Sequence, residues 1–184
     1  MSSAASAPAQ VTPATSNSAG ATVTDIAGKK YQLADKTQAA TVLVFIAHDC
    51  PISNFYAPEI DRLVLDYGKR KVRFFVVYAE ALSTGEARKH ALAFGFRVPL
   101  VRDTDFRLSH ALGARVTPEA VVLSPDGRRL YHGRIDNRYV DFGKKRVRAT
   151  QRDLREALDA VLKGEPVPHP ATTAVGCFIP DQTK

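Results

Sequence analysis

The chemistry of this 184-residue sequence centres on Cys50, one of its two cysteines. Cys50 follows an apolar run over residues 41–47 and precedes a segment whose apolar residues recur at helical spacing. Pro51 suits the first position of a helix, so Cys50 is expected at a helix N-terminus, where free backbone N–H groups favour a thiolate. A buried, inert cysteine is the alternative interpretation. The polar neighbours His48 and Ser53 favour the reactive thiol.

The elements that must position Cys50 alternate between strands and helices. We expect a short N-terminal hairpin, followed by strands over residues 41–47, 72–79, 98–101, 120–123 and 129–134. Helices are expected after Cys50, from a capping box of Ser83 with Glu86, over residues 105–112, and from a second box of Thr150 with Asp153. The segment 136–148 is polar and is expected to be irregular. This order predicts an α/β fold, with a central mixed sheet flanked by helices.

Composition limits the partners and the compartment. Lys and Arg outnumber Asp and Glu by 26 to 19, an excess more typical of a solvated surface than of a binding site. The basic run at residues 144–148 lacks interleaved aromatics, so no nucleic-acid partner is expected. No apolar stretch is long enough to span a membrane, and no membrane partner is expected. The N-terminal segment lacks the basic start and apolar centre of a secretory signal. We therefore expect a cytoplasmic protein, or a periplasmic one if a signal has been removed.

Three segments are expected from these patterns. Residues 1–22 are rich in Ser, Ala and Pro and predict a disordered tail. Residues 23–164 hold the alternating elements and predict one domain. Residues 165–184 contain prolines and the second cysteine, Cys177, and predict a flexible C-terminal tail.

Four sequence features together indicate a family. Cys50 lies in the motif DCPISN between the first core strand and its helix, and Pro58 follows within that helix. Thr117 and Pro118 immediately precede a core strand, in the stretch TPEAVVLSPDGRRLYHGRID. In these features the chain resembles the thioredoxin-like superfamily, and more closely the bacterial redoxin group known as AhpC/TSA-like or TlpA-like. The resemblance covers residues 23–164 and implies a thioredoxin-like fold, a cis proline at Pro118, and an antioxidant thiol oxidoreductase.

The sequence also departs from the pattern of these families. Ser53 replaces the second thiol of a C-x-x-C motif, so no disulfide closes within the motif. Ala47 stands where peroxiredoxins carry a threonine, and Leu43 where they carry a proline. The missing hydroxyl argues against efficient peroxide reduction.

Cys177 is the candidate to resolve an oxidised Cys50, because the resemblance extends to a Gly-Cys pair near the C-terminus. The Cys50 thiolate would attack a peroxide or a protein disulfide, Cys177 would condense with it, and an external thiol or dithiol reductant would restore both thiols. Thr117, Pro118, Ser53 and His48 would then form the substrate face. A static bridge to the tail and the absence of any pairing remain alternatives, because a disulfide requires sulfurs within bonding reach.

The alternative function is a non-catalytic module that binds a soft metal such as copper(I), or a protein partner. His48 would then join Cys50 and Cys177 as a ligand. Copper-delivery proteins of this fold keep their cysteines close together in one loop, a spacing that this chain lacks. We therefore expect no metal and no other cofactor.

Overall fold

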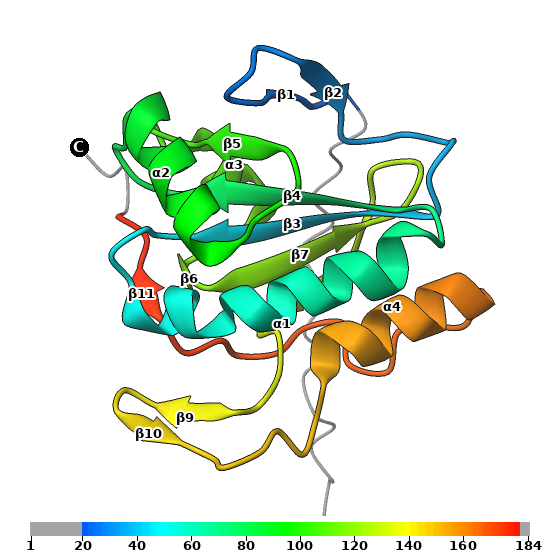
Figure 1. The fold of residues 1–184 in the computed structure, drawn as a ribbon. Helices are drawn as coiled ribbons and strands as arrows, with labels where there is room; N and C mark the ends of the chain where they lie inside the picture. Colours follow the sequence, from blue (N-terminus) through cyan, green and yellow to red (C-terminus); the bar gives the residue numbers. More distant parts are fainter. Residues whose placement is uncertain (1–19, 181–184) are drawn as a thin grey trace, which may run out of the picture.

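Two buried strands form the centre of the molecule in the computed structural model, which describes residues 20–180 (Figure 1). These strands are β3 (Ala40–Ile46) and β4 (Val72–Tyr78). Both are rich in apolar and β-branched residues, as expected of strands that are covered on both faces. They pair in parallel, so their carboxyl ends lie at the same edge of the sheet.

The other elements follow in chain order. The remaining strands are β1 (Thr22–Thr24), β2 (Lys30–Gln32), β5 (Leu100–Arg102), β6 (Val116–Thr117), β7 (Glu119–Leu123), β8 (Arg129–Gly133), β9 (Tyr139–Asp141), β10 (Lys144–Lys145) and β11 (Cys177–Phe178). The helices are α1 (Pro51–Gly68), α2 (Thr84–Phe94), α3 (Arg107–Leu112) and α4 (Asp153–Lys163). The main sheet has the order β5-β4-β3-β7-β8, with β7 antiparallel to both of its neighbours. The predicted mixed sheet and N-terminal hairpin are confirmed.

Helices cover both faces of this sheet (Figure 1). Leu63 of α1, Ala91 of α2 and Leu158 of α4 belong to one buried core. Leu112 of α3 and Val23 of the β1–β2 hairpin belong to the core on the opposite face. The molecule therefore has three layers, with the sheet in the middle.

One predicted helix cap is confirmed and the other is wrong. Ser83 and Glu86 form the expected reciprocal capping box of α2. Helix α4 begins instead with an N-cap that has no side-chain hydrogen bond. Thr150 does not cap it, because the Thr150 hydroxyl accepts a hydrogen bond from Asn137 Nδ2 at 2.8 Å. Asp153 is held by an ion pair with Arg134 at 2.8 Å, which competes with the predicted box.

Two further predictions on irregular segments change in the structure. The segment 136–148 contains the short hairpin β9–β10, which lies outside the main sheet. The C-terminal segment is not a free tail as far as residue 180. It pairs with β8 through His132 and Ala171, and then with β6 through β11. Residues 1–19 and 181–184 lie outside the described residues, and so does most of the predicted N-terminal disorder.

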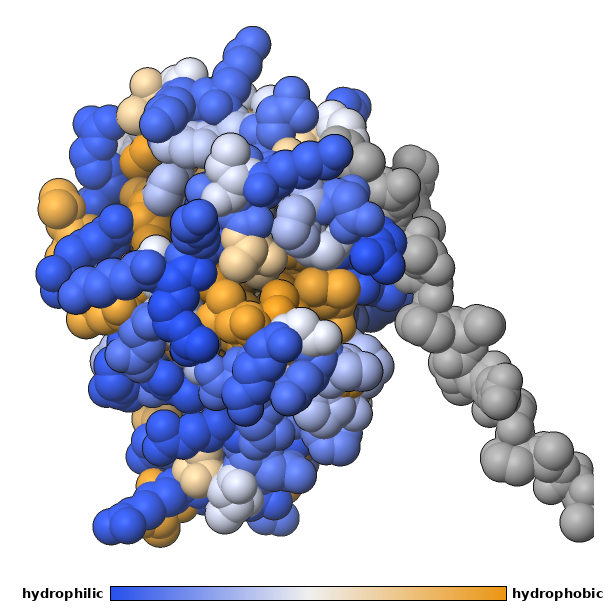
Figure 2. Space-filling model, turned by 90° about the vertical axis from the view of Figure 1, so that its right-hand side faces the viewer, coloured by the Kyte–Doolittle hydropathy of each residue, from blue (hydrophilic) through white to orange (hydrophobic). Residues whose placement is uncertain are grey.

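The surface carries both hydrophilic and hydrophobic side chains. Figure 2 shows a face that is mostly hydrophilic, with hydrophobic side chains gathered near its middle. Within residues 20–180, no helix combines the length and the apolar composition needed to cross a membrane.

Candidate active site

Cys50 occupies the N-cap of α1, directly beyond the carboxyl end of β3. Its backbone is extended, with φ −76° and ψ 113°, and Pro51 follows at the start of the helix. The Cys50 side chain is only 1% exposed. The predicted position at a helix N-terminus is therefore confirmed, and the thiol is covered.

The cover over Cys50 is the β6–β11 strand pair. In this antiparallel pair Cys177 lies opposite Thr117. The Cys50 sulfur is 3.2 Å from the Thr117 carbonyl oxygen, and the Cys177 thiol is hydrogen-bonded to the Cys50 sulfur. The two cysteines are both free thiols in this structure. The sulfurs of two residues that are 127 positions apart in the chain are thus hydrogen-bonded to each other.

This contact depends on Gly176. A Cβ atom at this position would lie 2.1 Å from the Thr117 carbonyl oxygen and 2.6 Å from its carbonyl carbon. Real side chains do not approach backbone atoms so closely, so only glycine lets β11 reach β6. The Gly-Cys pair noted in the sequence therefore has a steric reason.

The environment of Cys50 favours its thiolate. Burial by itself raises the pKa of Cys50. Hydrogen bonds from the thiol and backbone of Cys177, and from the hydroxyl and backbone N–H of Ser53, outweigh burial, and the pKa lies below the ordinary thiol value. The Thr117 carbonyl acts in the other direction, because it accepts a hydrogen bond only from the protonated thiol. We conclude that the donors prevail, since several of them face a single carbonyl.

Cys177 has the opposite character. Burial, the hydrogen bond to Cys50 and the negative charges of Cys50 and Asp49 raise the pKa of Cys177 to about 12. Cys177 is therefore the proton donor of the pair, and Cys50 is the acceptor.

The structure brings most of the predicted site residues together. Thr117 and Pro118 are joined by a cis peptide bond next to both cysteines, as the resemblance implies. Ser53 contacts Cys50 from the first turn of α1. His48 is the exception, because its side chain points to Glu80 rather than to either sulfur. Its Nδ1 atom lies 2.7 Å from Glu80 Oε2, and its backbone N–H donates to Glu80 Oε1 at 2.5 Å.

Glu80 is a site residue that the sequence reading missed. The hydrogen bond to Glu80 raises the pKa of His48 above its usual value, against the opposing effect of partial burial. The positions of His48 and Glu80 after two adjacent strands could have indicated this ion pair. Ile46 and Tyr78 are register partners at the ends of parallel strands, and His48 and Glu80 each lie two residues further along.

A second group of missed residues holds the loop that carries Cys50. The Asn54 side chain donates to the His48 carbonyl at 2.9 Å and accepts from His90 Nε2 at 2.8 Å. Burial and the nearby positive charge of His48 lower the pKa of His90. A neutral His90 that donates from Nε2 must accept at Nδ1, where the Tyr78 hydroxyl lies at 2.9 Å. The loop is thereby tied to α2 and β4.

A metal could be held beside this loop. His48, Asp49 and Glu80 present nitrogen and carboxylate atoms within 4.8 Å of one another. These donors suit hard or borderline cations rather than copper(I). Among residues 20–180 no such group includes either cysteine, so a three-ligand soft-metal site built on Cys50 and Cys177 lacks its third ligand.

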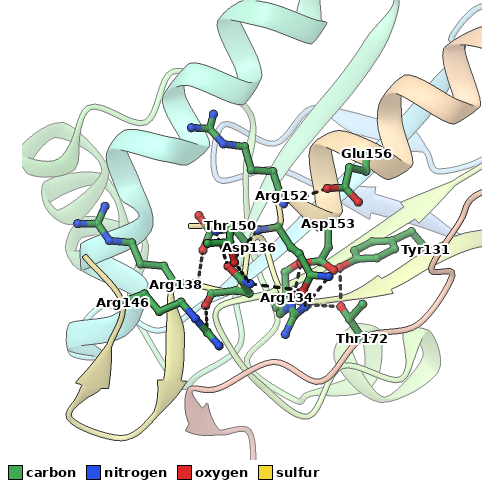
Figure 3. A network of polar contacts seen from close by, with 12 residues as sticks. Tyr131, Arg134, Asp136, Arg138, Arg146, Thr150, Arg152, Asp153, Glu156 and Thr172 are labelled. Atoms are coloured by element: carbon green, nitrogen blue, oxygen red, sulfur yellow. Dashed lines mark hydrogen bonds and ion pairs between the residues drawn. The ribbon is translucent and has the colours of Figure 1, made fainter. Parts of the chain in front are cut away.

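The strand that carries Cys177 is anchored where the C-terminal segment crosses β8. Thr172 Oγ1 lies 2.6 Å from the Tyr131 hydroxyl and accepts from Arg134 N at 3.1 Å (Figure 3). Arg134 in turn forms an ion pair with Asp153 at the start of α4. Gly133 permits this approach, because a Cβ there would lie 2.2 Å from Thr172 Oγ1. These contacts of Thr172 with Tyr131, Arg134 and Gly133 therefore fix the course of the segment that leads to Cys177.

Comparison with known families gives one match. The model of a family described as the AhpC/TSA family matches residues 15–130. Cys50, Thr117 and Pro118 lie within the matched residues, and Cys177 lies beyond them. A search of curated proteins finds no match.

Solved structures show a similar fold. An uncharacterized conserved protein from Geobacillus kaustophilus has a TM-score of 0.81 at 26% identity, covering 95% of each chain. A hypothetical protein from Sinorhizobium meliloti has a TM-score of 0.78 at 25% identity, covering 91% of this chain and 94% of the other. A secreted disulfide oxidoreductase from Mycobacterium tuberculosis has a TM-score of 0.55 at 19% identity, covering 76% and 94%. The last likeness is one of fold alone.

Proposed function

Because this chain belongs to the AhpC/TSA family and has a thioredoxin-like fold, we propose that it is a thiol-dependent oxidoreductase. In this proposal Cys50 is the nucleophile, and Cys177 resolves it by forming an intramolecular disulfide. Family membership and the disulfide oxidoreductase of similar fold support the reaction class. Neither identifies the substrate.

The observation that carries the proposal is the direct contact of two thiols with opposite proton preference. Cys50 has a lowered pKa, and Cys177 has a pKa raised to about 12. A nucleophile must be a thiolate, whereas a resolving thiol must stay protonated until it is needed. A static structural pair has no need of this asymmetry.

A hydroperoxide is the first candidate oxidant. The Cys50 thiolate attacks the terminal oxygen, the O–O bond breaks, and the leaving alkoxide or hydroxide takes a proton from solvent. Cys50 is then a sulfenic acid. The Cys177 sulfur attacks the Cys50 sulfur, the S–O bond breaks, and water leaves as the disulfide forms. Oxidation of Cys50 also removes the negative charge that raises the pKa of Cys177, which makes the second step easier.

A small disulfide is the second candidate substrate. The Cys50 thiolate would form a mixed disulfide and release one thiol, and Cys177 would then release the other. Burial of Cys50 favours small substrates in either case, because a folded protein can reach this sulfur only if β11 moves aside. Ala47 offers no hydroxyl to hold a peroxide, so Ser53 is the side-chain hydroxyl that we expect to contact one.

Reduction of the disulfide requires an external thiol or dithiol. Cys177 is partly exposed, whereas Cys50 is buried. We therefore expect the external thiolate to attack the Cys177 sulfur, with Cys50 as the leaving thiolate. A leaving thiol with a low pKa departs faster, and Cys50 has the lower pKa of the two.

A free-thiol count by intact mass tests this proposal. The reduced protein is treated with one equivalent of hydrogen peroxide, or of a small disulfide, and then with a thiol-blocking reagent. We expect the monomer to lose two hydrogens and to bind no blocking reagent. Cys50→Ser should retain its one thiol, and Cys177→Ser should stop at a sulfenic acid or a mixed disulfide. Survival of both wild-type thiols under both oxidants would reject the redox proposal.

A further inference from the structure

A cleft of about 610 Å³ lies beside the strand that carries Cys177. Gly176 and Phe178, the neighbours of Cys177, line this cleft. Successive residues of a strand face opposite sides, so the cleft lies on the side of β11 that faces away from Cys50. Asp141 and Phe142, at the tip of the β9–β10 hairpin, line the cleft as well.

Exposed apolar residues occur in the two segments that border this cleft, and two of them, Phe142 and Phe178, line it directly. Four of the seven exposed large hydrophobic residues among residues 20–180 belong to the hairpin segment or to β11: Val140, Phe142, Val147 and Phe178. The Phe178 side chain is 83% exposed. Exposed apolar groups that cluster next to a reactive group indicate an interaction surface.

The same segment carries unpaired positive charge. Residues 138–148 contain five cations and one carboxylate, Asp141; the cations are Arg138, Lys144, Lys145, Arg146 and Arg148. None of the five lies within ion-pair distance of a carboxylate in the part of the chain that the structure describes. By contrast, eight arginines elsewhere do so: Arg62, Arg70, Arg73, Arg97, Arg107, Arg128, Arg134 and Arg155. Arg138 and Lys145 each lie 4.8 Å from the centroid of the Phe55 ring, but a ring does not neutralise a cation, so the net positive charge of the hairpin is available to an acidic partner.

The hairpin is held in place by its base. Tyr139 packs edge-on against Phe55 of α1, with ring centroids 5.2 Å apart. Arg146 donates from its backbone to the Arg138 carbonyl at 2.7 Å and from its guanidinium to the Asn137 carbonyl at 2.6 Å (Figure 3). The tip is thus presented by a fixed support, which lowers the cost of ordering it on binding.

We propose that the hairpin surface, defined as Val140, Phe142, Lys144, Lys145, Arg148 and Phe178, docks an acidic protein dithiol that reduces the Cys50–Cys177 disulfide. This inference rests on the proposed function and names its partner. One partner thiolate attacks the disulfide and forms a mixed disulfide. The second partner thiol then attacks the partner's own sulfur in this mixed disulfide and releases the Cys177 thiol. The partner therefore leaves as a disulfide, and this chain regains both thiols. Electrons pass from partner to protein, and no other co-reactant is needed.

Two features favour a protein reductant over other occupants. Both chain neighbours of Cys177 line the cleft, and Cys177 is partly exposed whereas Cys50 is covered, so a partner on this surface lies within one residue of the sulfur that we expect an external thiolate to attack. The cations and the exposed apolar residues extend along the hairpin, beyond what a small thiol in the cleft would touch. The buried carboxylate at the cleft, Glu119, does not oppose an acidic partner. Its Oε2 atom accepts backbone N–H bonds from Arg115 at 2.7 Å and from Val116 at 3.3 Å, and its side chain is only 6% exposed, so it does not face the occupant of the cleft.

Reduction kinetics test the inference. The full chain is oxidised with peroxide, and the rate of disulfide reduction is measured with a bacterial thioredoxin, an acidic protein dithiol, and with dithiothreitol, a small uncharged one. A variant with Lys144→Glu, Lys145→Glu and Arg148→Glu is compared with a control that reverses three exposed lysines elsewhere, Lys30→Glu, Lys36→Glu and Lys69→Glu.

We expect the hairpin variant to react with thioredoxin at least about tenfold more slowly at low ionic strength, with a weaker dependence on salt. Dithiothreitol should reduce the disulfide of this variant at the wild-type rate. Equal rates would also show that the substitutions leave the Cys50–Cys177 site intact. A Phe142→Ser, Phe178→Ser variant should lose rate with thioredoxin at high salt as well. If the hairpin variant keeps the wild-type thioredoxin rate, or the control variant loses as much, the inference is wrong.

The outcomes separate this inference from the proposed function. If peroxide and small disulfides form no Cys50–Cys177 disulfide in the wild type, the proposed function fails, and this inference fails with it. If the disulfide forms and dithiothreitol reduces it, but charge reversal has no effect on thioredoxin, only the docking surface is rejected. An unchanged thioredoxin rate with lost binding to phosphatidylserine vesicles or duplex DNA would reassign the surface to those ligands.

Discussion

Cys177 of β11 donates a hydrogen bond to Cys50 at the N-cap of α1, and the two thiols have pKa values shifted in opposite directions. The donor comes from the C-terminal segment, and the acceptor from the start of α1. Removing the Cys177 donor should therefore raise the pKa of Cys50.

The pKa of Cys50 should be higher in Cys177→Ala than in Cys177→Ser. Both substitutions uncover Cys50 to a similar extent, but only serine keeps a hydroxyl donor. A hydrogen bond to a charged group contributes about 1.5–3 kcal/mol, which corresponds to about 1–2 pKa units. The ultraviolet absorbance of the thiolate, followed against pH, measures both midpoints. Equal midpoints would show that the Cys177 donor has no part in stabilising the thiolate.

Glu80→Gln should lower the pKa of His48. The glutamine carbonyl can still accept the His48 backbone N–H, so the change isolates the interaction with the ring. In the wild type the folded-state pKa of His48 is raised above 6.5. The stabilisation is therefore fully present below the unfolded pKa and is lost as the pH rises through the folded pKa.

Urea unfolding of the wild type and of Glu80→Gln at about pH 6 and about pH 8.5 checks this sign, since His48 titrates between these values. The difference in the free energy of unfolding should be larger at the lower pH. An NMR titration of the His48 ring gives the pKa directly. A difference that grows with pH would contradict the assigned ion pair.

Gly176→Ala should separate Cys177 from Cys50. The added methyl group would overlap the Thr117 carbonyl, so β11 must shift away from β6. Overpacking of this kind costs about 1–3 kcal/mol, and we expect disulfide formation after peroxide to slow by about tenfold or more. Gly85→Ala is the matched control, because the nearest atom to its Cβ is at 4.0 Å. Equal rates of disulfide formation in the two variants would contradict the steric role of Gly176.

Thr172→Val should loosen the segment that leads to Cys177. Valine has a similar shape but cannot bond the Tyr131 hydroxyl or the Arg134 backbone N–H. The Tyr131 hydroxyl keeps its bond to the Arg134 carbonyl at 2.6 Å, but the Arg134 backbone N–H loses its acceptor, and an unsatisfied buried donor costs about 1–3 kcal/mol. We expect faster hydrogen exchange over residues 171–178 and faster alkylation of Cys177. Thr173→Val, at an exposed neighbouring position, should change neither, and an equal response of the two variants would remove the case for this anchor.

The sequence predicted the elements around Cys50 because their signals are local. An apolar run specifies β3, Pro51 marks the start of α1, and Ser83 with Glu86 caps α2. Strands β6 and β11 have two residues each and no hydrophobic alternation. They exist because Thr117 and Cys177 pair across 60 residues of chain, which no local pattern can reveal.

The missed side chains have the same cause. The predicted cap at Thr150 failed because Asn137, from a preceding loop, engages its hydroxyl. Asn54 was visible within the DCPISN motif, but its partner His90 comes from α2. The predicted location of Cys50 thus needed only local rules, whereas the contact between the two sulfurs needed the tertiary fold.

The span of chain between the two cysteines gives the reaction a mechanical consequence. A disulfide joining Cys50 to Cys177 encloses 127 residue steps, from the start of α1 to the last strand. Closing a loop of that size removes enough conformational entropy from the unfolded chain to raise the free energy of unfolding by about 5 kcal/mol. Turnover of the site would therefore alternate the protein between a less stable reduced form and a more stable oxidised form. Resistance to heat and to proteases would then report the redox state of the Cys50–Cys177 pair.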